Sequence, residues 1–211
     1  MLGNIRFLLF GLCISLFSMA CNQAGVTATP AEVEIANPAS ENCIQQGGQL
    51  EMRQNEAGEY GICVFANGRS CDEWALYHGV CEQHQVLLTF FDRLAAGEYA
   101  AAAELYGGSY DVLQGYNPTV DPDDVATLWQ NGCQINGLQC LPVRIANFKE
   151  ETAVGETIFT VQFTAPDGSL FEREACCGDA QTTPPEFEFE FRVIRGEGGG
   201  YRVLDMPVYV P

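Results

Sequence analysis

Cysteine spacing constrains this chain more than any other feature of its sequence. Four cysteines and two glycine-marked turns fall between Asn37 and Cys81, a stretch too short to bury a self-sufficient core. Leaving out Cys13 and Cys21, eight cysteines remain, an even number without the paired C-x-x-C spacing typical of zinc sites. We therefore expect disulfides formed in an oxidising compartment, and they involve Cys43, Cys63, Cys71, Cys81, Cys133, Cys140, Cys176 and Cys177.

The first 20 residues are typical of a signal peptide. Arg6 is their single charged residue, and the apolar run that follows is too short to span a bilayer. The run ends in Ser-Met-Ala-Cys at Cys21, which resembles the lipobox of bacterial lipoproteins. The resemblance implies cleavage after Ala20 and a lipid on the Cys21 thiol. The alternative is an ordinary secretory signal that leaves Cys21 as an unpaired thiol.

Residues 21–36 are interpreted as a lipidated tether, because they are rich in Ala, Thr, Pro and Val without a helical or strand period. The N-terminal lipid would hold the protein at a membrane in the cell envelope, on the cell surface or the periplasmic face. The formal net charge of −18 argues against binding nucleic acid and against an electrostatic grip on anionic lipids.

Residues 37–81 are predicted to form a small hairpin-plus-helix module. Alternating residues predict strands at 50–53 and 60–65, joined by a turn. A helix capped by Ser70 is expected to follow, with acids in its first turn, and to end at Gly79. Such a helix would separate the α-carbons of Cys71 and Cys81 by roughly 13 to 15 Å. A disulfide spans less than that, so we expect the pairs Cys43–Cys71 and Cys63–Cys81.

Two motifs in this module resemble a known family. N-P-A-S-x-x-C-x-x-x-G-G begins at Asn37, and Y-G-x-C-x-F-x-x-G-x-x-C-x-E-W runs from Tyr60 to Trp74. The pattern is similar to that of a small domain of unknown function in bacterial secreted proteins, whose members are often labelled haemolysins. We do not extend that activity to this chain, because its sequence shows no long amphipathic segment and its acidity disfavours anionic membranes.

Metal binding is the alternative interpretation of two polar clusters. Thiol and imidazole groups at Cys71, His78, Cys81 and His84 stand at helical spacing and could hold zinc, but disulfides explain the cysteines better. The acids of Asp121-Pro122-Asp123-Asp124 lack the spacing of a calcium loop and are expected to cap a helix. We expect no metal and no cofactor.

Residues 82–211 are predicted to form an α+β domain. Helical spacing from residue 86 to 94 and from 99 to 106, and a third helix after Asp121, precede a run of alternating strands that begins near 143. Helices packed on a curved antiparallel sheet resemble the cone-shaped nuclear-transport-factor architecture. We expect each of Cys176 and Cys177 to bond one of Cys133 and Cys140, because a bond between neighbouring cysteines is strained.

The sequence predicts a binding protein rather than an enzyme. A cone offers an apolar pocket for a small ligand or peptide, here lined by Tyr110, Trp129, Phe159 and Phe163. Acids such as Asp111, Glu172 and Glu174 could reach it, but the sequence holds no catalytic motif and no histidine after His84. A structural or interaction role in the cell envelope is the alternative. The oligomeric state is not predicted.

Overall fold

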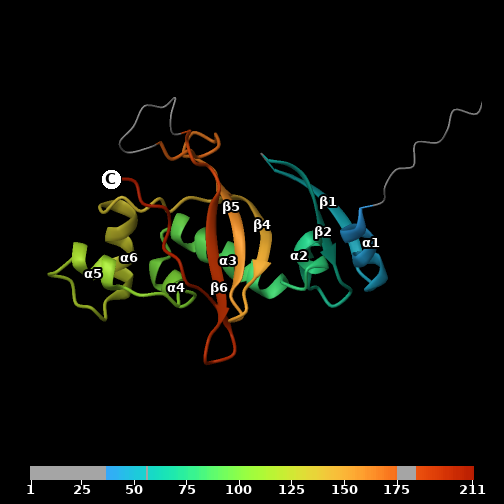
Figure 1. The fold of residues 1–211 in the computed structure, drawn as a ribbon, viewed down its shortest axis with the longest axis horizontal. Coiled ribbons are helices and arrows are strands. Elements are labelled where there is room, and N and C mark those ends of the chain that lie inside the picture. The colour runs from blue at the N-terminus through green and yellow to red at the C-terminus, as the bar shows by residue number, and fades with distance from the viewer. Residues whose placement is uncertain (1–36, 56, 175–183) are drawn as a thin grey trace, which may run out of the picture. The chain divides into compact units, whose positions relative to one another are not determined.

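The computed structural model describes residues 37–55, 57–174 and 184–211. The predicted signal peptide and tether, with Cys21, lie outside these residues, as do Cys176 and Cys177. Within them the α+β fold class is confirmed. A disulfide-rich three-stranded sheet with helices comes first, and helices with a four-stranded antiparallel sheet follow (Figure 1).

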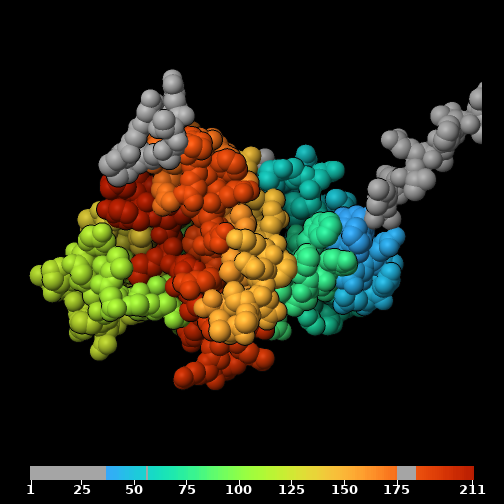
Figure 2. Space-filling model, viewed as in Figure 1, coloured from blue at the N-terminus to red at the C-terminus, as the bar shows by residue number. Residues whose placement is uncertain are grey.

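The first part begins with helix α1 (Pro38–Gln45), whose N-cap Asn37 accepts a hydrogen bond from the Ala39 amide. Strands β1 (Gln49–Asn55) and β2 (Gly58–Val64) form the predicted hairpin, in a register that pairs Met52 with Gly61. β2 also pairs with the short strand β3 (Ser70–Asp72), so the sheet order is β1-β2-β3. β1 is an almost wholly exposed edge strand, and its hairpin (teal) lies at the surface in Figure 2.

A helix before Gly79 is confirmed, but its predicted start at Ser70 is wrong, and so are the disulfides that we derived from that start. Ser70 and Cys71 lie in β3, and helix α2 (Glu73–Tyr77) is only five residues long, capped by the Asp72 carboxylate. Gly79 then adopts a φ of 75°, which turns the chain back at once. Cys81 therefore returns to within 5.7 Å of Cys71, measured between α-carbons, and the two are bonded.

The other disulfide of this part joins Cys43 on α1 to Cys63 on β2. Both sulfurs pack against Gly48, where a β-carbon would lie 2.3 Å from the Cys63 sulfur and 2.9 Å from the Cys43 sulfur. Both cysteines are fully buried. This bond fixes α1 on the hairpin, whereas Cys71–Cys81 joins β3 to the helix that follows.

The second part opens with helix α3 (Cys81–Ala95), followed by α4 (Tyr99–Ala103), α5 (Asp111–Tyr116) and α6 (Val125–Gln134). Strands β4 (Val143–Glu151), β5 (Thr157–Phe163), β6 (Phe189–Arg195) and β7 (Tyr201–Val203) pair in sequence order. Helix α5 was not predicted. In the region where the sequence predicts strands, residues 170–174 form only isolated bridges, Leu170 with Thr164 and Arg173 with Glu186.

The core of the second part forms between α3 and the sheet. Phe91 lies within 5 Å of both Phe163 and Phe191, measured between ring centroids, and meets each ring edge-on. The alternation of β5 places every second side chain in this core and the others towards solvent.

Among the helices of the described residues, none has both the length and the apolar character that crossing a membrane requires.

The third described disulfide joins Cys133 to Cys140, so the prediction that Cys133 and Cys140 each bond one of Cys176 and Cys177 is wrong. Helix α6 ends at Gln134, and Gly137 adopts a φ of 83°, where a β-carbon would meet the Val210 carbonyl oxygen at 2.3 Å. The chain therefore reverses immediately after α6. This reversal brings the α-carbon of Cys140 to 5.5 Å from that of Cys133.

Candidate functional site

The four side chains predicted to line an apolar pocket lie in or against the packed core instead. Trp129 and Phe159 are fully buried and Phe163 is nearly so. Tyr110 is partly buried and its hydroxyl accepts a hydrogen bond of 3.1 Å from the Trp129 indole. None of the four lines the groove described below or the smaller hollow beside α4 and α6. Neighbouring aromatic rings fill the space that a ligand was expected to occupy.

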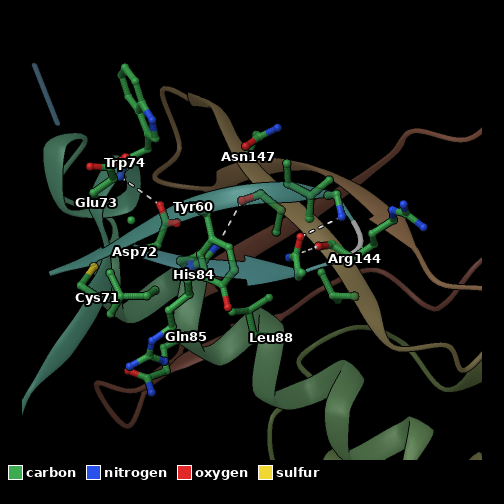
Figure 3. Close-up of a pocket in the computed structure, with 18 of the residues that line it drawn as sticks. Tyr60, Cys71, Asp72, Glu73, Trp74, His84, Gln85, Leu88, Arg144 and Asn147 are labelled. Carbon is green, nitrogen blue, oxygen red and sulfur yellow. Dashed lines mark hydrogen bonds between the residues drawn. The ribbon is translucent and has the colours of Figure 1, made fainter. Parts of the chain in front are cut away.

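The larger hollow is a groove of about 540 Å³ between the cysteine-rich sheet, α3 and β4 (Figure 3). The three-stranded sheet and α2 contribute one wall, with side chains that include Arg53, Asn55, Tyr60, Ile62, Asp72 and Trp74. The opposite wall is the stretch Val143–Asn147 of β4, which is the edge strand of its sheet.

Helix α3 supplies one stripe of side chains to the groove. Gln85, Leu88, Thr89 and Asp92 stand three, four and seven residues apart, so they share one helical face. The opposite face of the same helix carries the buried Leu87, Phe90, Phe91 and Leu94. The core thus fixes the rotation of α3 and thereby aims the polar stripe at the groove.

Two side chains close the exposed edge of β4. Asn55 donates its amide to the Arg144 carbonyl at 3.0 Å, and the Nε2 atom of His84 lies 3.1 Å from the Ala146 carbonyl oxygen. Because a carbonyl oxygen only accepts, the His84 Nε2 atom carries the proton in this contact. Both carbonyls thus accept from groups outside the β4–β5 ladder, at the edge where a further strand would otherwise pair; the register of that ladder shifts between Val143 and Ile145.

Burial governs the titration of two groups in the groove. The pKa of His84 is lowered mainly because burial disfavours the imidazolium, and the Asp72 charge and the Ala146 carbonyl oppose this effect only in part. The pKa of Asp92 is raised by burial. At neutral pH the arrangement favours an uncharged His84, which donates from Nε2.

Trp74 lies at the margin of the groove and is 44% exposed. Its indole projects from α2 away from His84 (Figure 3). The His78 ring stacks between Trp74 and Phe148, with centroid distances of 6.3 and 4.6 Å, respectively. This aromatic stack links α2 to β4 and leaves much of Trp74 open to solvent.

The neighbouring Glu73 has a structural role. Its buried carboxylate accepts hydrogen bonds from Asn37 at 2.9 Å and from Ser40 at 2.5 Å, which fastens the start of α1 to α2. A β-carbon at Gly61 would lie 2.6 to 2.9 Å from the Glu73 carboxyl group. Several residues of the sequence motifs therefore hold the module together, whereas Trp74 is the large motif side chain that faces solvent.

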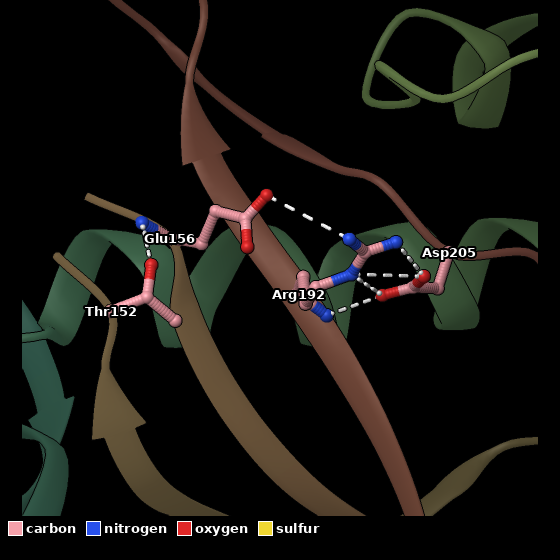
Figure 4. Close-up of polar contacts among 4 residues, drawn as sticks. All are labelled: Thr152, Glu156, Arg192 and Asp205. Carbon is pink, nitrogen blue, oxygen red and sulfur yellow. Dashed lines mark hydrogen bonds and ion pairs between the residues drawn. The ribbon is translucent and has the colours of Figure 1, made fainter. Parts of the chain in front are cut away.

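A separate polar cluster surrounds β6, two strands away from the β4 edge that lines the groove. Arg192 on β6 forms a bidentate ion pair with Asp205, whose carboxylate also accepts the Arg192 backbone amide at 2.7 Å (Figure 4). Glu156, at the turn before β5, lies 3.7 Å from the same guanidinium. The cluster ties the segment after β7 to the sheet, and we assign it a structural role.

Of the aspartates before α6, Asp124 caps the helix as predicted for this acidic run, whereas Asp121 bonds within the turn that precedes it. Asp121 accepts from the Asp123 amide, and Asp124 accepts from the Thr127 amide at 3.1 Å. Hydrogen bonding to Thr127 lowers the pKa of the Asp124 carboxyl group. Across the described residues, no cluster of three or more histidine, cysteine, aspartate or glutamate side chains is arranged to hold a metal ion.

The Glu73 contacts, the Cys43–Cys63 disulfide and one wall of the groove lie within a segment that resembles known sequences. Residues 34–80 match a domain of unknown function (DUF333). The chain is also 42% identical over 48 residues to the uncharacterized protein YoaF of Escherichia coli K12, and equally to YoaF of Shigella flexneri. The aligned segment is 23% of this chain and spans 57% of the length of these relatives. No solved structure matches the chain significantly.

These matches concern the first part of the chain. The relatives are uncharacterized, so they carry no specific role to this protein, and nothing in them identifies residues 82–211. The boundary at residue 81 and the cone architecture of the second part stay predictions. Sequence reasoning missed the groove because its β4 wall and α3 stripe lie far from the motif in sequence. The signal available in the sequence was Trp74, a large motif side chain that the structure shows to be half-exposed at the groove.

Proposed function

We propose that this protein is an extracytoplasmic lipoprotein that binds a small molecule or a peptide segment in the groove, without catalysing a reaction. The groove itself is the observation that carries the proposal. Its volume of about 540 Å³ falls within the range of small-molecule sites in proteins, roughly 300 to 1,000 Å³.

The lining selects the kind of ligand. Tyr60, Ile62 and Leu88 offer apolar surface, and Gln85 and Asn147 offer amide groups that donate and accept. This composition differs from the wholly apolar pocket expected from the sequence. The ligand is therefore one with an apolar body and several hydrogen-bonding groups.

The absence of catalysis is proposed from the state of the groove's acid–base groups. His84 is held neutral by burial, and its Nε2 proton is engaged by the Ala146 carbonyl. A general acid or base must instead have its proton, or its lone pair, within reach of a substrate. His84 is thus better suited to closing the β4 edge than to proton transfer.

The location follows from the cysteines. Three disulfides among the described residues indicate an oxidising, extracytoplasmic compartment. The lipobox-like residues before Cys21 support a lipid anchor. Radiolabelled palmitate should be incorporated into the full chain in bacterial cells and not into the Cys21→Ser variant; equal labelling of both would refute the anchor.

Binding is tested with a soluble form that begins at Asn22. Trp74 is half-exposed at the groove and Trp129 is fully buried, so the Trp74→Phe variant separates the two fluorescence signals. We would screen metabolites and short peptides by native mass spectrometry and follow each hit by fluorescence. A groove ligand should bind at least tenfold more weakly to Leu88→Glu and equally well to Val154→Glu, whose site is exposed and outside the groove lining.

Hits that bind both charged variants alike would place the ligand elsewhere and overturn the groove proposal.

The structural or interaction role is the second candidate, supported by exposed apolar side chains outside the groove. Tyr116 and Tyr209 stack with a centroid distance of 6.2 Å while each stays about half exposed. Crosslinking to envelope proteins that Tyr209→Ser abolishes and Leu88→Glu does not would favour that role.

A further inference from the structure

We propose that Cys71–Cys81 is a thiol-exchange site, opened by a dithiol reductant and reformed by an oxidant disulfide, and that the other two described disulfides are structural. The proposal rests on where the three bonds lie, and it does not depend on the proposed ligand. It adds a site with a defined chemistry to the groove.

Access is the first difference, and it separates Cys71–Cys81 from Cys43–Cys63; Cys133 and Cys140 are themselves half-buried, so access does not set their bond apart. Cys71 and Cys81 both line the groove, where Cys81 is half-buried and Cys71 is 9% exposed, so an external thiolate can reach their bond only through the groove. Cys43 and Cys63 are fully buried beneath Gly48 and line neither described hollow. Disulfide exchange requires a thiolate to reach one sulfur, so burial protects Cys43–Cys63.

The helix ends are the second difference. Cys81 is the first residue of the 15-residue helix α3, whose N-cap, Val80, makes no side-chain capping hydrogen bond. The amides of this first turn can therefore stabilise a thiolate at Cys81. Cys133 lies in the last turn of α6, where the helix dipole has the opposite sign and disfavours a thiolate.

The charges around the groove disulfide decide which sulfur leaves. Asp72 follows Cys71 directly, and its negative charge disfavours a thiolate there. Glu82 follows Cys81 but is exposed, so water and salt screen its charge. His84, one turn into α3, is neutral and adds no charge. Attack is therefore expected at the Cys71 sulfur, with Cys81 as the leaving thiolate.

The exchange is balanced as a transfer of two electrons. One thiolate of the dithiol attacks the Cys71 sulfur, the bond between Cys71 and Cys81 breaks, and the Cys81 thiolate takes a proton from solvent. The second thiolate of the reductant then attacks its own sulfur in the mixed disulfide. This step releases Cys71, which is protonated in turn, and leaves the reductant as a cyclic or protein disulfide. Reoxidation runs through the same steps in reverse.

Opening the bond has a local structural consequence. The closed loop between Cys71 and Cys81 contains α2 with Trp74 and the His78 ring. Once it opens, the Glu73 hydrogen bonds and the aromatic stack on Phe148 are what still hold α2. The groove wall formed by α2 thus becomes dependent on the redox state.

The test uses the full mature chain. Free thiols are first blocked with N-ethylmaleimide under native conditions, and the protein is then incubated with graded dithiothreitol. Newly exposed thiols are alkylated with iodoacetamide and assigned by peptide mapping, while far-ultraviolet circular dichroism monitors the fold. We expect Cys71 and Cys81 to be labelled at a dithiothreitol concentration at least tenfold below that needed for Cys43, Cys63, Cys133 or Cys140, with the fold retained.

Labelling of Cys133 and Cys140 first, or of all six cysteines together as the circular dichroism signal is lost, would overturn the proposal. The Cys71→Ser/Cys81→Ser double variant is the matched control, and it should show no labelling in the low range. A second readout is kinetic: at low ionic strength, where the charge at position 82 is less screened, Glu82→Lys should accelerate opening by favouring the Cys81 thiolate. Slower or unchanged opening in that variant would contradict the assigned leaving group.

Discussion

Cys63 and Cys71 lie directly opposite one another on β2 and β3, yet they belong to different disulfides. Facing residues of an antiparallel pair come within about 4.5 to 5.5 Å, close enough for a bond between them. Their true partners reach them from helices: Cys43 from α1 and Cys81 from the start of α3. The two bonds therefore hold two different helices to the same strand pair.

Loss of the buried bond should cost more than loss of the bond after α6. Cys43–Cys63 closes a loop of 20 residues and Cys133–Cys140 one of 7, so loop entropy assigns them about 3.3 and 2.4 kcal/mol, respectively. Cys43→Ala/Cys63→Ala should lower the free energy of unfolding by at least about 3 kcal/mol, because it also leaves a cavity. Urea denaturation measures both double variants, and a smaller loss in the first would contradict the structure.

The Glu73 carboxylate should be a major contributor to stability. Glu73→Ala removes two hydrogen bonds to a charged group and leaves Asn37 and Ser40 without their acceptor, a cost of about 2 to 4 kcal/mol. The matched control is Glu197→Ala, whose side chain is exposed in the turn after β6 and should change the free energy by less than about 0.5 kcal/mol. Equal effects of the two variants in urea denaturation would refute the role of Glu73.

A methyl group at Gly61 should be poorly tolerated. The added β-carbon would lie within 3 Å of the Glu73 carboxyl group, which is anchored at both oxygens, so Gly61→Ala should destabilise by about 1 to 3 kcal/mol. Gly115→Ala, in α5, meets nothing within 4 Å and should be neutral or stabilising by about 0.5 to 1 kcal/mol. Thermal melts should show a lower midpoint for Gly61→Ala and an unchanged or higher one for Gly115→Ala.

Protonation of His84 should weaken the fold in mild acid. Its pKa is lower in the folded state than the value of 6.5 for an unperturbed histidine, so the unfolded chain binds the proton more strongly. Stability is therefore complete above about pH 6.5 and falls as the pH drops from there towards the folded pKa. His84→Gln, which keeps an amide donor for the Ala146 carbonyl, should lose less stability between pH 7 and 5 than the natural chain.

The control for that measurement is His78→Gln, because His78 is exposed and is the other histidine of the chain. A change of the slope of unfolding free energy against pH that occurs in His84→Gln and not in His78→Gln assigns the acid response to His84. If His84→Gln keeps the slope of the natural chain as well, carboxyl groups rather than His84 govern the acid response.

Local pattern predicted the parts of the fold that local residues determine. The hairpin of β1 and β2 followed from two alternating runs around a turn, and α3 from apolar spacing that its core face confirms. The cap at Asp124 followed from an acidic run before apolar residues. In each case the signal and the structure lie within about fifteen residues of one another.

The errors arose where a turn reversed the chain earlier than expected. A helix assumed from residue 70 separated Cys71 from Cys81, whereas β3 and the turn at Gly79 bring them together. The groove was missed for a related reason. Its walls come from β2, α3 and β4, and only the pairing of distant segments places Tyr60 near His84 and Ala146.

The bond between Cys71 and Cys81 also bears on how this protein should be divided for experiments. The segment recognisable by similarity stops at residue 80, so a fragment cut there would keep Cys71 and discard the cysteine that it is bonded to. Such a fragment would expose an odd thiol opposite Cys63 and invite mispairing during expression. A usable fragment has to continue through α3, which makes the first helix of the second part a covalent extension of the recognised module.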